Sequence, residues 1–230
     1  MLSEIGLIGL GVMGKNIALN IAEKGTFVKA FNGSQEKIDA ISDEFGGMFS
    51  GFTKLEELID NLERPRNILL MIPSGQPTQS VVNQLSNLLD EGDVIIDGGN
   101  SFYQESENHG NIISSKSIEF IGMGVSGGEE GALKGPSIMP GGSVSAWPEV
   151  RGIFQAISAK VEDNEPCCDW IGEGGSGHFV KMVHNGIEYG DMQLISEAYH
   201  FMQSCLGMNN EDMHEVFSEW NTTELDSYLI

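Results

Sequence analysis

Three polar side chains in the segment 179–191 have residue types and a spacing that suit acid–base chemistry. Lys181, Asn185 and Glu188 stand at positions i, i+4 and i+7, so a helix would bring them to one face. The positions around them carry apolar side chains: Phe179, Val180, Met182, Val183 and Ile187. We therefore expect a buried helix whose ammonium, amide and carboxylate need polar partners, which a ligand would supply. A structural Lys–Glu pair on a solvated face is the alternative, and this segment alone does not separate the two.

A glycine motif near the N-terminus has the spacing of a dinucleotide-binding turn. Residues 4–9 read as a short buried strand, and Gly9, Gly11 and Gly14 then open an amphipathic helix in the pattern G-x-G-x-x-G. The first glycine would allow the tight turn, the second the approach of a pyrophosphate, and the third close helix–strand packing. A second apolar strand at 26–31 completes the context of a nucleotide site. The cofactor-binding residues expected in this motif are Gly9, Leu10, Gly11, Val12, Met13 and Gly14.

The end of the second strand normally distinguishes the two nicotinamide cofactors. An acid there binds the ribose 2′-hydroxyl of NAD, whereas a basic group accommodates the 2′-phosphate of NADP. This chain has Asn32, Gly33 and Ser34, with neither an acid nor an arginine, and Lys37 follows one helical turn later. Because Lys37 could reach a phosphate we expect NADP, although an ordinary exposed lysine is an equally good reading of that residue.

Composition and charge limit the class of protein and its partners. The 230 residues are 40% hydrophobic, enough for a sizeable core, and the strand–helix alternation predicts an α/β fold: a Rossmann-type doubly wound sheet over 1–175, followed by the start of an all-helical domain over 176–230. The net charge of −22 disfavours nucleic acid and anionic membranes as partners. No apolar run resembles a membrane span or signal peptide, so we expect a cytoplasmic protein.

Cysteine usage and the remaining segments add further expectations. Cys167, Cys168 and Cys205 have neither a disulfide framework nor a metal-site spacing, so we expect reduced packing residues and no metal. Apolar strands are expected at 67–72, 93–96 and 118–121. The second ends in Asp97-Gly-Gly-Asn100-Ser101, where ligands bind in an open α/β sheet, and the third enters the glycine-rich segment 122–131. A strand at 168–171, a glycine hinge at 172–177, a long helix to about Leu206 and a helix over 210–230 complete the chain.

These segments together resemble the 6-phosphogluconate dehydrogenase family along essentially the whole chain. The wider β-hydroxyacid dehydrogenase superfamily shares the early fingerprint, a Ser-Gly-Gly loop and a catalytic lysine. The most specific motifs are Asp97-Gly-Gly-Asn100-Ser101, Gly124-Val-Ser-Gly-Gly-Glu-Glu-Gly131, Met139-Pro-Gly-Gly142, Glu165-Pro-Cys-Cys-Asp-Trp170 and Gly177-His-Phe-Val-Lys-Met-Val-His-Asn-Gly-Ile-Glu-Tyr-Gly-Asp191.

The resemblance implies an enzyme of the pentose phosphate pathway that converts 6-phospho-D-gluconate and NADP to ribulose 5-phosphate, carbon dioxide and NADPH, as a homodimer. Lys181 would take the C3 hydroxyl proton and later protonate the carbonyl oxygen, and Glu188 would protonate C1 of the enediol. A lysine serves as base only if its surroundings bring its pKa toward about 7–8. The implied substrate-binding residues are Asn100, Ser126, Gly127, Gly128, His184, Asn185 and Tyr189. The implied cofactor-binding residues beyond the glycine motif are Asn32, Gly33, Ser34, Lys37, Ile72 and Asn100.

The chain departs from the family in three places. Gly33 stands where NADP-specific members carry an arginine, which leaves NAD as a possible cofactor, and Pro73 stands where many members have a lysine. The family's chain also continues through an extensive helical domain, so we expect this sequence to be part of a longer protein. Two alternatives therefore stay open: a related β-hydroxyacid dehydrogenase acting on a smaller acid, or a dinucleotide-binding piece without activity.

Overall fold

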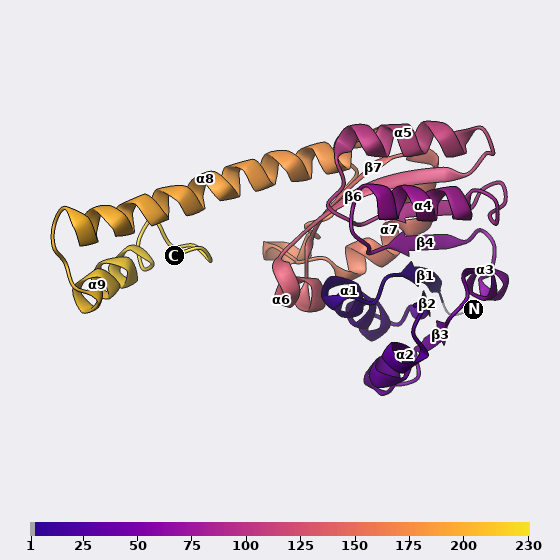
Figure 1. The fold of residues 1–230 in the computed structure, drawn as a ribbon, viewed down its shortest axis with the longest axis horizontal. Coiled ribbons are helices and arrows are strands. Elements are labelled where there is room, and N and C mark those ends of the chain that lie inside the picture. Colours follow the sequence, from indigo (N-terminus) through magenta and orange to yellow (C-terminus); the bar gives the residue numbers. More distant parts are fainter. Residues whose placement is uncertain (1–2) are drawn as a thin grey trace. The chain divides into compact units, whose positions relative to one another are not determined.

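A mixed, mostly parallel sheet forms the first part of the chain. The computed structural model describes residues 3–230, and Figure 1 shows its elements in chain order. The strands are β1 Glu4–Ile8, β2 Phe27–Phe31, β3 Phe49–Phe52, β4 Asn67–Leu70, β5 Val94–Asp97, β6 Glu119–Ser126, β7 Ser137–Gly142 and β8 Gly172–Glu173. Their order is β3-β2-β1-β4-β5-β6-β7-β8, and β7 is antiparallel to β6 whereas the other neighbouring pairs are parallel. The expected α/β class with a doubly wound sheet is confirmed.

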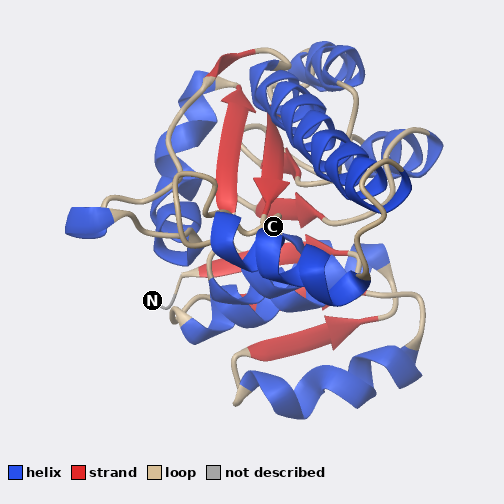
Figure 2. Ribbon diagram, turned by 90° about the vertical axis from the view of Figure 1, so that its left-hand side faces the viewer, coloured by secondary structure: helices blue, strands red, loops and turns tan. Residues whose placement is uncertain are grey.

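Helices cover both faces of this sheet, as Figure 2 shows. The α-helices are α1 Val12–Glu23, α2 Gln35–Ser42, α3 Leu55–Asn61, α4 Gln76–Leu85, α5 Tyr103–Ser114, α6 Gly128–Lys134, α7 Trp147–Ile157, α8 Ser176–Ser204 and α9 Asn210–Trp220, with short 3₁₀ turns at Asp43–Phe45, Val144–Ala146 and Glu162–Asn164. In β5, Val94 and Ile96 belong to the core with α1 and α7, while Ile95 belongs to the core with α3, α4 and α5. Alternate side chains thus supply two cores, which is why the parallel strands read as unbroken apolar runs.

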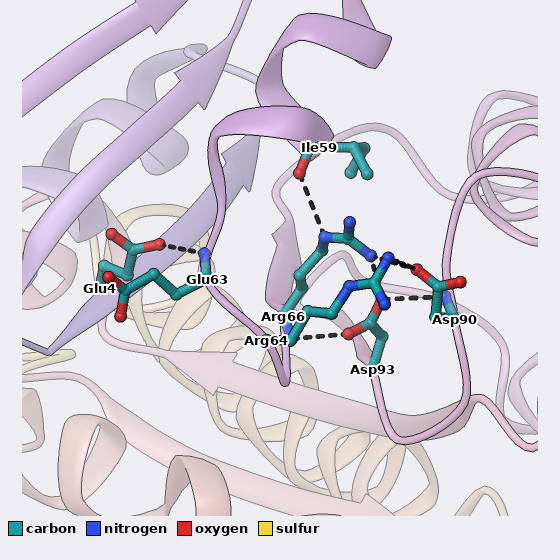
Figure 3. Close-up of polar contacts among 7 residues, drawn as sticks. All are labelled: Glu4, Ile59, Glu63, Arg64, Arg66, Asp90 and Asp93. Atoms are coloured by element: carbon teal, nitrogen blue, oxygen red, sulfur yellow. Dashed lines mark hydrogen bonds and ion pairs between the residues drawn. The ribbon is translucent and has the colours of Figure 1, made fainter.

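A buried ion-pair cluster supports the ends at which β4 and β5 begin (Figure 3). Arg66 is buried, and its Nη1 lies 2.8 Å from carboxylate oxygens of both Asp93 and Asp90, while its Nε donates to the Ile59 carbonyl at 3.1 Å. The backbone N–H of Arg66 also donates to Asp93 at 2.7 Å. The hydrogen bond from Arg66 lowers the pKa of the Asp90 carboxyl. A buried guanidinium needs such partners, and the cluster ties together the residues that precede the two strands.

Two compact units make up the chain, the first ending at Met182 and the second covering Val183–Ile230. Helix α8 begins at Ser176, and the expected domain border between residues 175 and 176 stays a prediction. No helix within the described residues is both long and apolar enough to cross a membrane.

Two expected elements differ from those observed. The strand expected at 168–171 is wrong: β8 is Gly172–Glu173, and Cys168 makes only an isolated bridge to Ile138. The neighbouring strand contains Pro140, which has no N–H to donate, so a regular ladder does not extend along it. The helix expected over 210–230 ends at Trp220 and turns follow, because the Thr222 and Thr223 hydroxyls donate back to nearby carbonyls.

The expected burial of the 179–187 apolar side chains in α8 is also wrong for this chain. Phe179, Met182, Val183 and Ile187 are exposed, Ile187 by 63%. The helix meets the sheet with its other side: a Cβ on Gly177 would lie 2.2 Å from the Gly122 carbonyl oxygen. Positions 177, 178 and 181 share that side of the helix. These apolar side chains are therefore exposed to solvent within the part of the chain that the structure describes.

Candidate active site

The carboxyl ends of the central parallel strands meet at one edge of the sheet. Ile8 is in register with both Phe31 and Leu70, Leu70 with Asp97, and Asp97 with Gly122. The chain leaves β1 toward β2 and β3 on one side and returns to β4 on the other, so the topological switch point lies between β1 and β4. Open α/β sheets bind ligands in the crevice at such a point. The glycine motif follows β1 directly and therefore lies at this crevice.

The glycines of the motif have the backbone and packing roles expected of them. Gly9 has φ +104°, and a Cβ there would lie 2.4 Å from the Met71 carbonyl oxygen. A Cβ on Gly14 would lie 2.0 Å from the Gly9 carbonyl oxygen, so the start of α1 packs directly on the turn. Gly11 is the N-cap of α1, with no side-chain cap and no acid in the first turn. The first N–H groups of α1 are thus available to an anion at the positive end of the helix.

The remaining expected cofactor residues divide into supporting and accessible positions. Leu10 and Met13 are half-buried and pack against the core, and Ile72 lies beside Gly9, whereas Val12 is exposed. At the end of β2, the Asn32 Oδ1 accepts the Ser34 N–H at 3.0 Å, and the Ser34 Oγ accepts the Lys37 N–H as the N-cap of α2. Gly33 and the Lys37 side chain are exposed beside this turn. These positions can accommodate a ribose phosphate, but they do not by themselves determine whether one binds.

The turn after β5 is held by a fully buried carboxylate. Asp97 Oδ1 accepts the Gly99 N–H at 3.0 Å, and its Oδ2 accepts the Ser101 hydroxyl at 2.6 Å. Asn100 stands between these two anchored residues and is exposed. Asn100 was predicted as a site residue, whereas Asp97 was given no role. An acid at the end of an apolar strand, followed by glycines and a serine, is the sequence signal that could have identified it.

In the glycine-rich segment 122–131, strand β6 continues as far as Ser126. Gly127 and Gly128 follow with φ values of +132° and +60°, and α6 begins at Gly128. Glycine at position 124 admits helix α8: a Cβ there would lie 2.5 Å from the Lys181 Cβ. Lys181 is half-buried against this strand. The first unit therefore brings Lys181 onto the strand that ends in the Ser126–Gly128 loop.

His178 of α8 is buried, and it was not among the residues predicted for the site. Its Nδ1 lies 2.6 Å from the Ser106 Oγ in α5, and its Nε2 lies 3.0 Å from the Gly99 carbonyl oxygen. Burial lowers the pKa of this imidazole, against the opposing effect of the Asp97 carboxylate. No local periodicity could have revealed a contact between residues 72 positions apart.

The other expected residues of α8 lie in the second unit. The helix runs without interruption through Lys181 and on to Glu188, as the spacing of the polar residues required. His184 Nδ1 lies 3.7 Å from Glu188 Oε2 and 3.2 Å from Asn185 Oδ1, and all three side chains are half-buried. Tyr189 is 70% exposed. An amide, an imidazole and a carboxylate thus cluster within one turn of this helix, a donor–acceptor set able to bind hydroxyl and carboxylate oxygens.

The cysteines differ from one another in their burial. Burial raises the pKa of the Cys168 thiol to about 12, which keeps it protonated, whereas Cys205 is exposed and is not the packing residue expected. Its place after the end of α8 explains the difference. Residues 3–230 contain no group of His, Cys, Asp and Glu side chains arranged to hold a metal ion.

Two family models match the chain: the NAD binding domain of 6-phosphogluconate dehydrogenase matches residues 4–172, and the C-terminal domain of 6-phosphogluconate dehydrogenase matches residues 177–230. The decarboxylating 6-phosphogluconate dehydrogenase of Mus musculus is 52% identical over 230 residues, which cover 99% of this chain and 48% of the mouse protein.

Solved structures agree with the family models. A 6-phosphogluconate dehydrogenase from Plasmodium falciparum, described in its apo form and in complexes with NADP+ and with 6-phosphogluconate, matches with a TM-score of 0.92 and 45% identity, over 98% of this chain and 49% of that chain. A 3-hydroxyisobutyrate dehydrogenase from Mycobacterium tuberculosis matches with a TM-score of 0.77 but 18% identity, over 100% of this chain and 74% of that chain, and so shares the fold alone. This chain spans about half the length of the mouse and Plasmodium proteins.

Proposed function

This chain belongs to the 6-phosphogluconate dehydrogenase family, and from that premise we propose that the protein containing it oxidises and decarboxylates 6-phospho-D-gluconate, giving D-ribulose 5-phosphate and carbon dioxide with reduction of NADP. One observation carries the proposal: Lys181 packs on β6 at Gly124, two residues before the Ser126–Gly128 loop. That strand belongs to the sheet whose switch point bears the dinucleotide motif. A basic side chain and a cofactor crevice are thereby built into one unit.

The residues of the glycine motif and the β2 turn fit NADP. The uncapped N-terminus of α1 suits a pyrophosphate, the lack of a side chain at Gly11 leaves space for its approach, and Lys37 is an exposed cation three residues after the β2 turn. When bound, NADP supplies the hydride acceptor for C3 of the substrate. The chain's charge of −22 repels an anionic ligand at long range, so these local positive elements must do the binding.

In the proposed mechanism, Lys181 and Glu188 carry the protons. Lys181 accepts the C3 hydroxyl proton as C3 is oxidised to the ketone, and returns a proton to the carbonyl oxygen when carbon dioxide leaves. Glu188 then protonates C1 of the enediol. Asn100, the Ser126–Gly128 loop, His184, Asn185 and Tyr189 bind the hydroxyl and carboxylate groups of the substrate, since each offers a hydroxyl, amide, imidazole or backbone N–H.

The proposal extends to the setting of the enzyme. We place it in the cytoplasm as a homodimer of the longer protein, with 6-phosphogluconate as its small-molecule partner and with neither nucleic acid nor membrane bound. The acidic charge of the chain supports the last two points.

Parallel measurement of NADPH and carbon dioxide tests this function. The purified chain, and a chain extended to the relatives' length, would each receive NADP with 6-phosphogluconate or with an unphosphorylated short 3-hydroxy acid. Equal amounts of NADPH and carbon dioxide from 6-phosphogluconate alone are expected from the extended chain. NADPH formed from the short acid without carbon dioxide would instead establish the smaller-acid dehydrogenase. Binding of NADP without turnover in either chain would refute the enzymatic proposal.

A further inference from the structure

A chain of hydrogen bonds links helix α5, helix α8 and the turn after β5. Ser106 of α5 meets His178 Nδ1 at 2.6 Å, and His178 Nε2 meets the Gly99 carbonyl oxygen at 3.0 Å. His178 is 1% exposed, and Ser106 is equally buried. This link lies wholly in the first unit and is outside the set of residues assigned above to substrate or cofactor.

The direction of each bond follows from the chemistry of its ends. A carbonyl oxygen can only accept, so the proton of the neutral imidazole must be on Nε2. Nδ1 is then an acceptor, and the Ser106 hydroxyl donates to it. Burial lowers the pKa of the imidazole, which keeps it in this neutral form. The ring is therefore held in one tautomer and orientation by a partner on each side.

The turn that His178 contacts is anchored from the opposite side as well. The Asp97 carboxylate accepts from the Gly99 N–H and from the Ser101 hydroxyl. Gly99 thus has its N–H bound to β5 and its carbonyl bound to α8, and Asn100 is the next residue. On α8, Lys181 follows His178 by three positions and so lies on the same side of the helix.

We propose that His178 is a positioning residue, which fixes the backbone at Gly99 and thereby sets the place of Asn100 relative to Lys181. This inference rests on the function proposed above. It explains how Asn100 and Lys181, two residues of that site, keep a fixed position relative to each other. Both ring nitrogens of the histidine are bonded within the protein, to Ser106 and to Gly99. It acts through the Gly99 carbonyl, and catalytic geometry is sensitive to displacements of about 1 Å.

Four variants test the proposal. His178→Phe keeps a ring of similar size and removes both hydrogen bonds, and His178→Gln retains an amide N–H able to reach the Gly99 carbonyl. Ser106→Ala removes only the Nδ1 partner, and it carries the test if His178→Phe does not fold. His109→Phe is the matched control: His109 is an equally buried histidine in α5 that contacts Gln79 rather than the turn.

Two independent readouts apply. In this chain, His178→Phe is expected to speed hydrogen exchange at the Gly98–Ser101 amides about tenfold, the effect of one lost hydrogen bond, while His109→Phe leaves those amides unchanged. In the form that turns over 6-phosphogluconate, His178→Phe is expected to lower kcat by about tenfold to a hundredfold with the KM for NADP within about threefold, and His178→Gln to restore part of the rate.

Each outcome either supports or overturns the positioning role of His178. Unchanged exchange in a folded His178→Phe chain, or equal losses of kcat in His178→Phe and the His109→Phe control, would overturn the proposal. Faster exchange with an unaltered kcat would overturn it too. If the unmodified protein shows no turnover, the proposed function fails on that result alone, and a positioning role for this site fails with it, whatever the exchange data show.

Discussion

Replacement of Gly33 by arginine tests how this chain distinguishes NADP from NAD. The β2 turn carries neither an acid for the ribose hydroxyl nor an arginine for a 2′-phosphate, and the exposed Lys37 follows it by one helical turn. The position accepts a side chain, because no other atom lies within 4 Å of a Cβ built on Gly33 and its φ is not in the left-handed region. The bond from the Ser34 N–H to Asn32 would keep the turn in place.

The size of the effect follows from one charge-assisted contact. Such a bond contributes about 1.5–3 kcal/mol, which corresponds to roughly tenfold to a hundredfold in affinity. Gly33 is exposed, so solvent screening places the expected gain near tenfold. NAD lacks the 2′-phosphate, and its affinity should change only through the single unit of added positive charge.

Dissociation constants for both cofactors, measured at low and moderate salt, provide the assay. The control is Gly152→Arg, which adds the same charge at an exposed position of α7, where a Cβ also meets nothing within 4 Å. NADP should bind about tenfold more tightly to Gly33→Arg alone, and the gain should shrink as salt rises. An equal gain for NAD, or an equal gain in the Gly152→Arg control, would refute the placement of the 2′-phosphate at this turn.

Three further predictions concern stability and reactivity. Asp93→Ala leaves Arg66 buried with one fewer carboxylate, and urea denaturation should show a loss of about 3 kcal/mol, the low end for a broken buried pair. Because burial lowers the pKa of His178 below its unfolded value, the unfolded chain binds more protons on acidification, so urea midpoints should fall as the pH drops below about 6.5. Iodoacetamide should modify exposed Cys205 quickly and Cys168 only in denaturant, as peptide mass spectrometry would show.

Each of these predictions has a control. The control for Asp93→Ala is Glu130→Ala, which breaks an exposed ion pair and should leave the urea midpoint almost unchanged. An equal loss in the free energy of unfolding in Asp93→Ala and Glu130→Ala would contradict the role given to burial. His178→Gln should flatten the stability profile between about pH 5 and 6.5 relative to the unmodified chain, and an unaltered slope would contradict the assignment to this histidine. Rapid labelling of Cys168 in the folded chain would contradict its burial.

The fold could be predicted where a local pattern carried the information. The turn at Gly9–Gly14 and the amphipathic helix α1 that begins there follow directly from glycine spacing and apolar periodicity. The course of β6 could not be predicted in this way, because glycines such as Gly122 and Gly124 are typical of turns. Their role is to let helix α8 pack on the strand, and only the folded structure shows it. The exposure of the apolar side chains of α8 was not predicted either. Apolar periodicity shows which side chains share a helix face, but it does not show whether another element covers that face.

The residues of the candidate site could be predicted only in part from the sequence. The residues that offer donors to a ligand, such as Asn100 and Lys181, stand in recognisable motifs. Asp97 holds its motif through the nearby Gly99 and Ser101, so its local sequence contains a signal for it. His178 is connected by tertiary hydrogen bonds to Ser106 and Gly99, which only the folded chain brings near. A single sequence contains no local signal for such pairs.

The most direct test of the central claim is the effect of Lys181→Met on NADPH formation from 6-phosphogluconate, with NADP affinity measured in the same preparation. If Lys181 transfers the proton at C3, the rate should fall by about 10²-fold or more while NADP binds within about threefold of the unmodified protein. A variant that binds NADP normally and keeps its rate within about tenfold would contradict the account, because general acid–base catalysis of this step would then come from another group.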